Sequence, residues 1–440
     1  MKSGPPSSLR NYAAGMEHLA GVLRSLREDA AFTQEQLAEK SGLSVRTVSD
    51  IERGIRKRLY RDTAERLARA LGLPGPASEE FVELARGRTS GMRRELDSGF
   101  RRRFVAWHVD RIGALADHAG NEEQWFAVLD ADESNLAVAL RWASEDEDAE
   151  SLLLLATGLF RYWQARGNLR VGREWLERGL SAAPAVSTPT RMAALWGLGW
   201  LAFHQGDDAL ASRCAQELTA LADESGDGAA RRNAATVSGM VSLANGDSQA
   251  AVESMERALS LARELGEPWI LATSLLNLGM ARIAAADTSA ARAVLGEAIR
   301  EYAALGDERF RARSLGYLGL ASLVDGDPER AVSLYAQGLV VFHGLSEGKG
   351  IAESLTGLAT AAAMRGNAIR AAQLAGAAER IRESFGGRVF PVERRLADAT
   401  LARAEAETGA HAWHEAWTCG RALRDDEAIA MALDDPLSAR

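Results

Sequence analysis

The sequence predicts an all-α chain in two parts: five short helices packed as a small domain, followed by a solenoid of helical hairpins. Residues that favour helices are abundant, whereas the runs of β-branched and aromatic residues that are typical of strands are missing. Over residues 16–86, apolar residues recur at helical spacing between capping residues. From about residue 150, the sequence repeats itself with a period of 40.

These patterns divide the chain into six segments. They are a disordered leader (1–15), the five-helix domain (16–86), a polar linker (87–99), a helical bridge (100–149), the repeats (150–425) and a tail (426–440). The linker, GRTSGMRRELDSG, is rich in Gly, Ser and Arg, whereas the bridge is dense in large apolar residues such as Trp125 and Trp142.

The charge of the chain is unevenly distributed. Residues 1–103 contain 20 Lys and Arg against 14 Asp and Glu, which gives +6 there and leaves −15 for the rest of a chain whose net charge is −9. The basic residues cluster at 53–61 and 86–103. A basic end on an acidic body predicts a nucleic-acid contact near the N-terminus and little such contact elsewhere.

Cysteine usage and hydropathy predict a cytoplasmic protein. Cys214 and Cys419 are too few for a disulfide framework, which fits a reducing compartment. The chain opens without a secretory apolar segment and has no run of 18 apolar residues, so we expect no membrane association.

Residues 33–54, TQEQLAEKSGLSVRTVSDIERG, predict two short helices joined by a tight turn. Thr33 and Ser44 are placed to cap the two helices, and Gly42 can adopt the positive φ that ends the first. The apolar residues of both helices face inward together, which leaves polar residues such as Arg46 on the outer side. A short, capped helix of this kind is what the major groove of DNA admits.

Residues 16–86 resemble the phage repressor/Cro (XRE) family of helix-turn-helix domains. The matching positions are Thr33-Gln34, Leu37-Ala38, Gly42, Leu43-Ser44, Val48-Ser49, Ile51-Glu52 and Gly54. The resemblance implies that double-stranded DNA is a partner and that bases are read by Val45, Arg46 and Asp50. It also implies phosphate contacts from Thr33, Gln34, Ser44, Thr47, Arg53, Arg56, Lys57, Arg58 and Arg61.

Two of the base-reading assignments have alternatives. Arg46 can donate two parallel hydrogen bonds to guanine O6 and N7, or it can be a solvated surface arginine. Asp50 can accept from cytosine N4, or it can merely pair with Arg46 or Arg53.

The repeats carry two recurring pairs of residues. A Leu-Gly pair or a close variant recurs at Leu198, Leu278, Leu318 and Leu358, and a Gly-Asp pair or a close variant recurs at Gly206, Gly246, Ala286, Gly326 and Gly366. Small residues let two helices approach closely, and the second pair marks a turn in which the aspartate caps the next helix. Each unit is therefore predicted to be a helix, a turn and a helix.

Residues 150–390 resemble the tetratricopeptide family in its 40-residue variety, with a degenerate unit near 392–423 closing the stack. The resemblance implies a right-handed superhelix with a concave inner wall. The order of the two parts resembles regulators that carry a switch ATPase between them, yet only residues 87–99 lie there. Residues 344–350, GLSEGKG, depart from the phosphate-loop pattern in spacing and in Gly350, so we expect no nucleotide hydrolysis.

In tetratricopeptide repeats, the first helix of each unit lines the groove, and an apolar wall there suits a small molecule or a peptide. The side chains expected in this ligand groove are Arg161, Trp163, Trp196, Trp200, Phe203, Met240, Leu276, Met280 and Arg282. The alternative is that these side chains pack between adjacent helices.

The sequence offers no constellation for catalysis. His411 and His414 flank Trp413, but a metal site needs three or four convergent ligands, so we expect no metal and no cofactor. No nucleophile with a nearby base and no pair of catalytic carboxylates stands out, and an enzyme is not expected.

The two parts together predict a DNA-binding transcriptional regulator whose repeats sense a small molecule, a peptide or a partner protein. A homodimer is expected, because two recognition helices one DNA turn apart would read an operator. The alternatives are a peptide-pheromone receptor with the same domain order, and a scaffold whose N-terminal domain no longer binds DNA.

Overall fold

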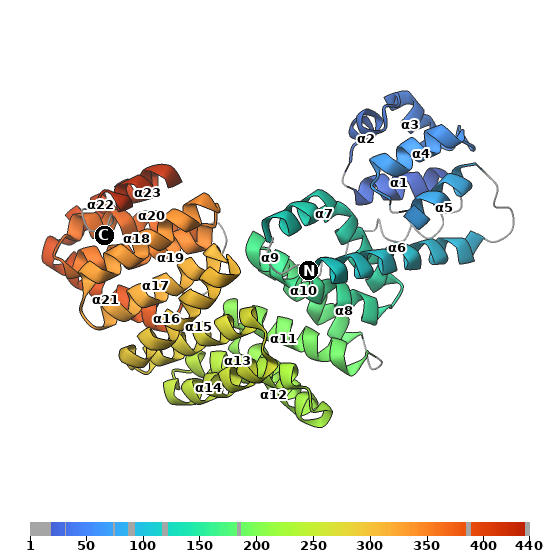
Figure 1. Cartoon of the computed structure of the whole chain (residues 1–440). Helices are drawn as coiled ribbons and strands as arrows, with labels where there is room; N and C mark the ends of the chain where they lie inside the picture. The colour runs from blue at the N-terminus through green and yellow to red at the C-terminus, as the bar shows by residue number, and fades with distance from the viewer. Residues whose placement is uncertain are drawn as a thin grey trace, which may run out of the picture. The chain divides into compact units, whose positions relative to one another are not determined.

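The computed structural model describes residues 19–30, 32–73, 75–86, 93–116, 122–182, 186–383 and 389–435, and the expected leader at 1–15 lies outside them (Figure 1). Within these ranges the chain is all-α and contains no strand, as predicted. No helix in the described part of the chain has the length and apolarity needed to cross a membrane. The chain forms two compact units: residues 1–162 with 177–187, and residues 163–176 with 188–440.

Five short helices form the N-terminal domain, as expected. They are α1 (Leu19–Asp29), α2 (Gln34–Ser41), α3 (Val45–Glu52), α4 (Arg61–Ala70) and α5 (Gly75–Ala85). Thr33 and Gln36 form the predicted capping box at α2, and Ser44 caps α3 by accepting a hydrogen bond from the backbone of Thr47. Gly42 ends α2 with φ of 62°, in the left-handed region that favours glycine. The helix-turn-helix geometry thus follows from local capping.

The bridge begins earlier than predicted. Helix α6 (Arg93–Ala116) already starts inside the expected linker, and α7 (Glu122–Glu145) forms the second long helix of the bridge. The rings of Phe104 and Trp142 pack edge to face across α6 and α7, with centroids 5.0 Å apart. The remaining helices before the regular repeats are α8 (Ala149–Gly158), α9 (Phe160–Arg166) and α10 (Leu169–Ser181). The boundary between the two units passes through α9 and α10.

Five regular hairpins follow, and their helices begin at intervals of 40 residues, as predicted. The first helices are α11 (Thr188–His204), α13 (Gly228–Ala244), α15 (Pro268–Ala284), α17 (Glu308–Val324) and α19 (Gly348–Met364). The second helices are α12 (Asp208–Ser225), α14 (Ser248–Leu265), α16 (Thr288–Leu305), α18 (Pro328–Gly344) and α20 (Ala368–Glu383). An aspartate caps four of the second helices, namely Asp207, Asp247, Asp287 and Asp327.

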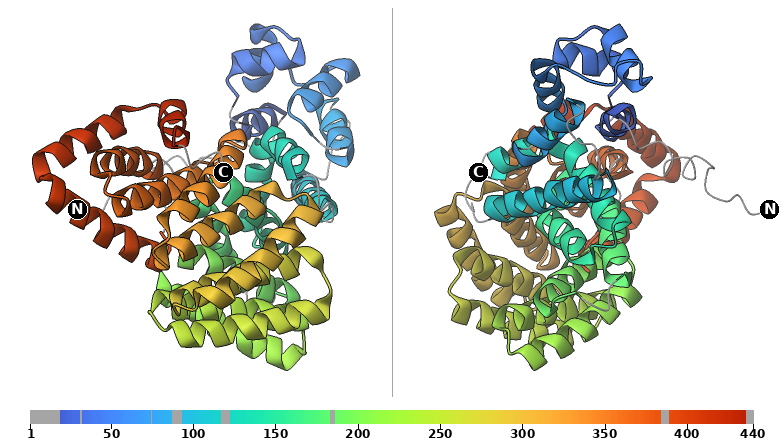
Figure 2. Two further views of the ribbon diagram at one scale, coloured as in Figure 1. Left: turned by 60° about the vertical axis from the view of Figure 1, so that its left-hand side comes forward. Right: turned by 90° about the vertical axis from the view of Figure 1, so that its right-hand side faces the viewer.

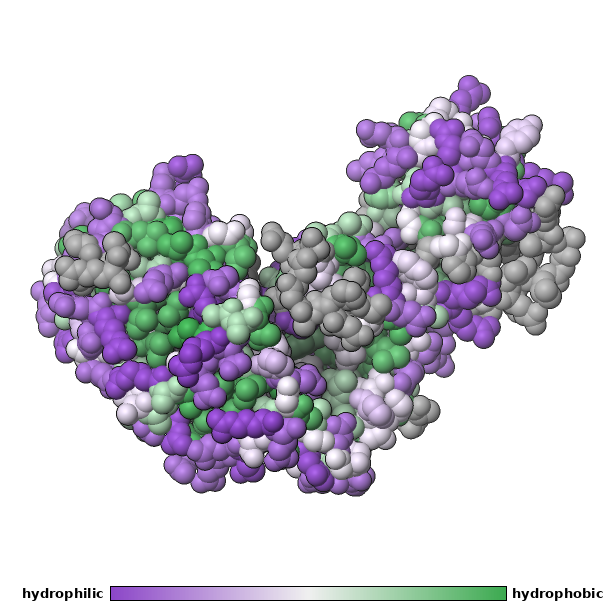
Figure 3. Space-filling view, in the orientation of Figure 1, coloured by the Kyte–Doolittle hydropathy of each residue, from purple (hydrophilic) through white to green (hydrophobic). Residues whose placement is uncertain are grey.

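The hairpins of the second unit succeed one another along a curved path (Figures 1 and 2). Each first helix contacts the first helix of the next hairpin, from α11 through α19 to α21 (Pro391–Thr408). The first helices therefore form a continuous inner wall. Figure 3 shows hydrophobic surface interrupted by hydrophilic side chains over the C-terminal hairpins.

The C-terminal end differs from the prediction. Helix α22 (Ala410–Ala422) lies against α20 with backbones in direct contact, because Gly376 and Gly420 leave no side chain at the crossing. The segment 426–440 was expected to be a tail, but α23 (Asp425–Leu433) packs on α18, α19 and α20 and buries Ala428 and Ile429. Its apolar face makes it part of the core rather than an extension.

Candidate functional sites

Helix α3 presents an exposed outer face. The side chain of Arg46 is 91% exposed, and its Nε lies 4.0 Å from Oδ2 of Asp50, at the outer limit of an ion pair. Val45, at the start of the helix, is 41% exposed although it is apolar. A surface arginine held so loosely remains available to an external acceptor.

The inner face of α3 is anchored by apolar and ionic contacts. Val48 and Ile51 are fully buried, and the carboxylate of Glu52 is buried beside them. Arg27 of α1 donates to Glu52 from Nε at 2.6 Å. Gln34 was expected near a phosphate, but its amide donates to Glu52 Oε2 at 2.8 Å. In this structure, Gln34 thus positions α3 from within the domain.

The segment after α3 carries cations without internal partners. Arg53, Arg56, Lys57 and Arg58 are exposed, and their side chains form no ion pair or hydrogen bond with other described residues. Arg61, the last of the expected phosphate contacts, instead donates to Glu65 of its own helix at 2.6 Å. Four cations within six residues, none of them paired with another described residue, create a positive field beside α3.

Two exposed apolar side chains on the same segment escaped the sequence prediction. Ile55 is 59% exposed and Tyr60 is 87% exposed, beside the uncompensated cations. The hydroxyls of Ser44 and Thr47, both expected at phosphates, bond to each other at 2.9 Å, and Thr33 uses its hydroxyl for the cap of α2. The exposure of Ile55 and Tyr60 could have been predicted from the sequence, because a large apolar residue in a basic, polar loop has no core to join.

Most residues expected in the ligand groove pack between helices. Phe203, Met240 and Leu276 are buried, and Met280 is half-buried. Trp200 is 9% exposed and stacks on His204 with centroids 3.6 Å apart. The alternative of interhelical packing therefore describes these side chains better than the groove does.

Trp196 is half-buried, and the guanidinium carbon of Arg232 lies 5.6 Å from its ring centroid. Trp163 is buried against Gly172 of α10. Arg161 belongs to the first compact unit and Trp163 to the second.

Arg282 lies on the other side of the wall. It pairs with Glu256 of α14 and with Asp287 at the turn before α16, the latter at 3.0 Å. It borders a groove of about 670 Å³ between α14, α15 and α16, lined also by Leu259 and Val294. Since α14 and α16 are second helices, Arg282 faces away from the inner wall.

A polar series occupies one register of the inner wall, and the sequence prediction did not identify it as a series. At intervals of 40 residues the first helices carry Asn233, Thr273, Arg313, Glu353 and Glu393. Asn233 Oδ1, Arg313 Nε and Glu393 Oε1 are buried atoms with no hydrogen-bond partner among the described residues. Unpaired buried polar atoms are rare in folded proteins and mark positions where a ligand or water can be accommodated.

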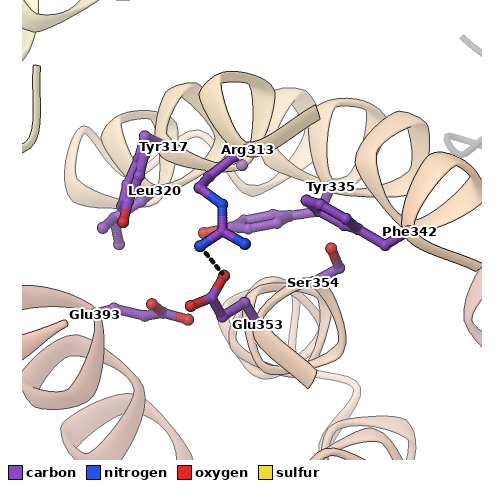
Figure 4. A pocket seen from close by; sticks show the side chains of 9 residues that line it. Arg313, Tyr317, Leu320, Tyr335, Phe342, Glu353, Ser354 and Glu393 are labelled. Atoms are coloured by element: carbon purple, nitrogen blue, oxygen red, sulfur yellow. Dashed lines mark ion pairs between the residues drawn. The ribbon is translucent and has the colours of Figure 1, made fainter. Parts of the chain in front are cut away.

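The last three members of this series meet around a cavity between α17, α19 and α21 (Figure 4). The cavity measures about 20 Å³, enough for one water molecule. It is lined by Arg313, Gly316, Tyr317, Leu320, Tyr335, Phe342, Glu353, Ser354 and Glu393. Arg313 donates to Glu347 at 2.5 Å, and its Nη1 lies 3.9 Å from Glu353.

Burial and neighbouring charges perturb the acids and bases of this cluster. Burial and the adjacent Glu353 raise the pKa of Glu393 to about 8, against the weaker opposing effects of Arg382 and Lys349. Burial lowers the pKa of Lys349. Burial alone would raise the pKa of Glu347, but Arg313 and Arg309 hold it below its usual value. Of these three groups only Glu393 lines the cavity, whereas Glu347 and Lys349 pair with Arg313 and Glu353, which do.

Comparison with known proteins supports both parts of this architecture. Residues 18–81 match the family model described as a helix-turn-helix domain. No curated protein sequence matches the chain. Three of the solved structures that are similar to the chain are described next.

A Rap protein, solved in complex with Competence and Sporulation Factor, is similar with a TM-score of 0.52 and 11% identity, covering 74% of this chain and 99% of that chain. PlcR from Bacillus thuringiensis, solved with the peptide PapR7 and DNA, gives a TM-score of 0.35 and 13% identity, covering 75% of this chain and 96% of that chain.

A Signal Transduction ATPase with Numerous Domains (STAND) protein from Pyrococcus horikoshii carries a tetratricopeptide repeat sensor. It gives a TM-score of 0.46 and 12% identity, covering 98% of this chain and 68% of that chain. At these identities, the likeness to the Rap protein concerns the fold alone. The chain thus joins a helix-turn-helix domain to a tetratricopeptide-like helical solenoid.

Proposed function

We propose that this protein is a DNA-binding transcriptional regulator of the XRE type, in which α3 reads an operator and the repeat domain senses a signal. The observation that carries the proposal is the group of uncompensated cations at 53–58 beside the exposed face of α3. Arg27 already pairs with the buried Glu52, and none of these four cations pairs with a described residue. Phosphate groups are the ligand that such a patch fits best.

In the proposed complex, α3 lies in the major groove with Arg46 directed at a guanine. Arginine suits this role because its two parallel N–H groups match guanine O6 and N7. Arg56, Lys57 and Arg58 then neutralise the flanking phosphates, and Tyr60 packs against the sugar-phosphate backbone. A homodimer, with α3 of each copy about 34 Å apart, would read two half-sites on one face of the duplex.

The sensing role rests on the inner wall of the solenoid. The buried polar atoms of Asn233, Arg313 and Glu393 lack partners, so a ligand that supplied them would bind with favourable hydrogen bonds. A protein of this repeat fold, Rap, was solved in complex with Competence and Sporulation Factor. Ligand binding on the wall would change operator affinity by altering the curvature of the solenoid or the dimer interface.

The DNA role is tested by selecting fragments of total genomic DNA on the full chain and sequencing those retained. The Arg46→Ala variant is expected to lose about 1–3 kcal/mol against the selected site and to relax preference at one base pair. The control is Arg403→Ala, which removes an exposed arginine from α21 and should leave selection unchanged. Retention without sequence preference by the native chain would overturn the proposal and favour a scaffold.

A further inference from the structure

We infer that the cavity between Glu353 and Glu393 is a subsite for an ammonium group of the sensed ligand. The inference rests on the proposed function in that the inner wall is taken to bind the signal. It commits to one chemistry: a primary amine whose –NH₃⁺ enters between the two carboxylates.

The first support is geometric. Glu353 of α19 and Glu393 of α21 point into the same space from two different helices (Figure 4). Glu393 is 7% exposed, and its Oε1 has no hydrogen-bond partner among the described residues. A buried carboxylate oxygen without a donor is costly, and a cationic N–H group removes that cost most completely.

The second support is the supply of acceptors. The hydroxyls of Tyr317 and Tyr335 form no hydrogen bond with other described residues, and both side chains line the cavity with Ser354. An ammonium group has three donors and no acceptor. Two carboxylates and three hydroxyls around one small space match that requirement, and the two aromatic rings add favourable contact with a cation.

The third support is that the nearby cations are already paired, with Lys349 and Arg313 each 3.9 Å from Glu353 itself. Arg313 also bonds to Glu347 at 2.5 Å, and Arg382 donates to Thr356 at 2.6 Å. A ligand carboxylate would therefore meet the carboxylate of Glu353 and no unengaged cation. The exception is the single buried Nε–H of Arg313, which suits a neutral oxygen next to the amine.

The volume of the cavity fits an ammonium group. The cavity of about 20 Å³ holds one water-sized group. An ammonium group is of that size, and the rest of the ligand would extend along the inner wall. The cavity is too small for a guanidinium or a ring.

Binding of the amine should be accompanied by release of a proton from Glu393. With a pKa of about 8, the Glu393 carboxyl carries a proton at pH 7. The titratable and charged groups that face it are Glu353 and Lys349 of α19, Arg382 of α20, Arg313 and Tyr317 of α17, and Tyr335 of α18. The incoming ammonium ion takes the place of that proton, which leaves for the solvent. Amine binding at pH 7 should thus release close to one proton, and less than half of one at pH 9.

The test uses the full chain and hexylamine, with hexanol and hexanoate as probes that differ only in the head group. Titration calorimetry in two buffers of different ionisation enthalpy measures both affinity and protons released. We expect hexylamine to bind, hexanol and hexanoate to bind at least tenfold more weakly, and proton release to fall from pH 7 to pH 9.

Glu393→Gln is expected to weaken hexylamine binding by tenfold or more and to abolish proton release. Since the native carboxyl is uncharged at pH 7, this variant should fold, and circular dichroism verifies it. The control Glu407→Gln removes an exposed carboxylate of α21 and should change neither quantity. It also accounts for non-specific attraction of an amine to an acidic protein.

The inference is overturned if hexylamine shows no binding, if hexanoate binds more tightly, or if Glu393→Gln binds hexylamine as the native chain does. Equal displacement of the proton by sodium chloride would indicate an inorganic cation and would likewise overturn it. Any of these results obtained with a chain that still selects an operator rejects the amine subsite and leaves the proposed DNA role in place.

Discussion

Arg27 and Glu52 form a two-point ion pair inside the helix-turn-helix domain. Arg27 donates from Nε to Oε1 at 2.6 Å and from Nη2 to Oε2 at 3.1 Å, and the Glu52 side chain is 1% exposed. The pair joins α1 to the last residue of α3, and Gln34 adds a third donor from α2. The orientation of the recognition helix thus depends on one buried carboxylate.

Glu52→Ala is expected to destabilise the N-terminal domain by roughly 3–5 kcal/mol, because it leaves the guanidinium of Arg27 without its main partner in a buried site. Hydrogen exchange of the amides at 34–52 in the full chain measures the effect separately from the repeats. Glu39→Ala, at an exposed position of α2, is the matched control and should leave exchange unchanged. Equal protection in the two variants would show that the pair does not hold α3.

Replacing Arg56, Lys57 and Arg58 together by alanine should weaken binding to all DNA sequences alike. Each phosphate contact contributes about 0.9 to the slope of log affinity against log salt, so the slope should fall by about 2–3. Affinity measured at several salt concentrations on the selected operator and on a scrambled duplex provides the check. A changed base preference with an unchanged slope would assign these residues to base reading instead.

Ala286 occupies a left-handed position with φ of 59°, where the four equivalent turns have glycine at φ between 76° and 80°. An L-residue with a side chain costs about 1–2 kcal/mol there, so Ala286→Gly should stabilise the repeats by up to about 1 kcal/mol after the entropy of the unfolded chain is counted. Thermal unfolding of the full chain should shift upward by a few degrees.

The neighbouring Ala285→Gly serves as the control for this prediction. Ala285 has φ of −81°, so glycine relieves no strain there and should lower stability slightly. If both variants shift the midpoint in the same direction and by the same amount, the left-handed turn is not the cause.

The architecture was predictable because it is encoded locally. The capping residues Thr33 and Ser44 and the aspartates of the repeat turns act within four residues of their own position, so the helix boundaries could be read from spacing. The hydrogen bond of Gln34 could not be predicted in this way, because its partner Glu52 is 18 residues away and is brought close only by tertiary packing.

The inner wall was mispredicted for a different reason. The first helices carry apolar residues on both sides, so the residues after each Leu-Gly pair could face either the groove or the adjacent helix. The structure buries Leu276 and places the other stripe, which includes Arg313 and Glu353, around the cavity. The 40-residue period contains that information, because a polar residue recurs at the register of Arg313, but most of the groove was assigned to the register that follows the Leu-Gly pairs.

Glu393 should make the stability of the repeats depend on pH. Its pKa is about 8 in the folded chain against about 4.5 when unfolded, so between these values unfolding releases a proton and rising pH favours unfolding. Glu393→Gln removes this contribution to the pH dependence of stability. The unfolding midpoint of the variant should match that of the native chain near pH 4.5 and exceed it progressively up to pH 8. Calorimetry across this range tests the trend, with Glu407→Gln expected to show a constant difference. A difference that stays flat for Glu393→Gln would mean that the carboxyl is already ionised in the folded chain at neutral pH.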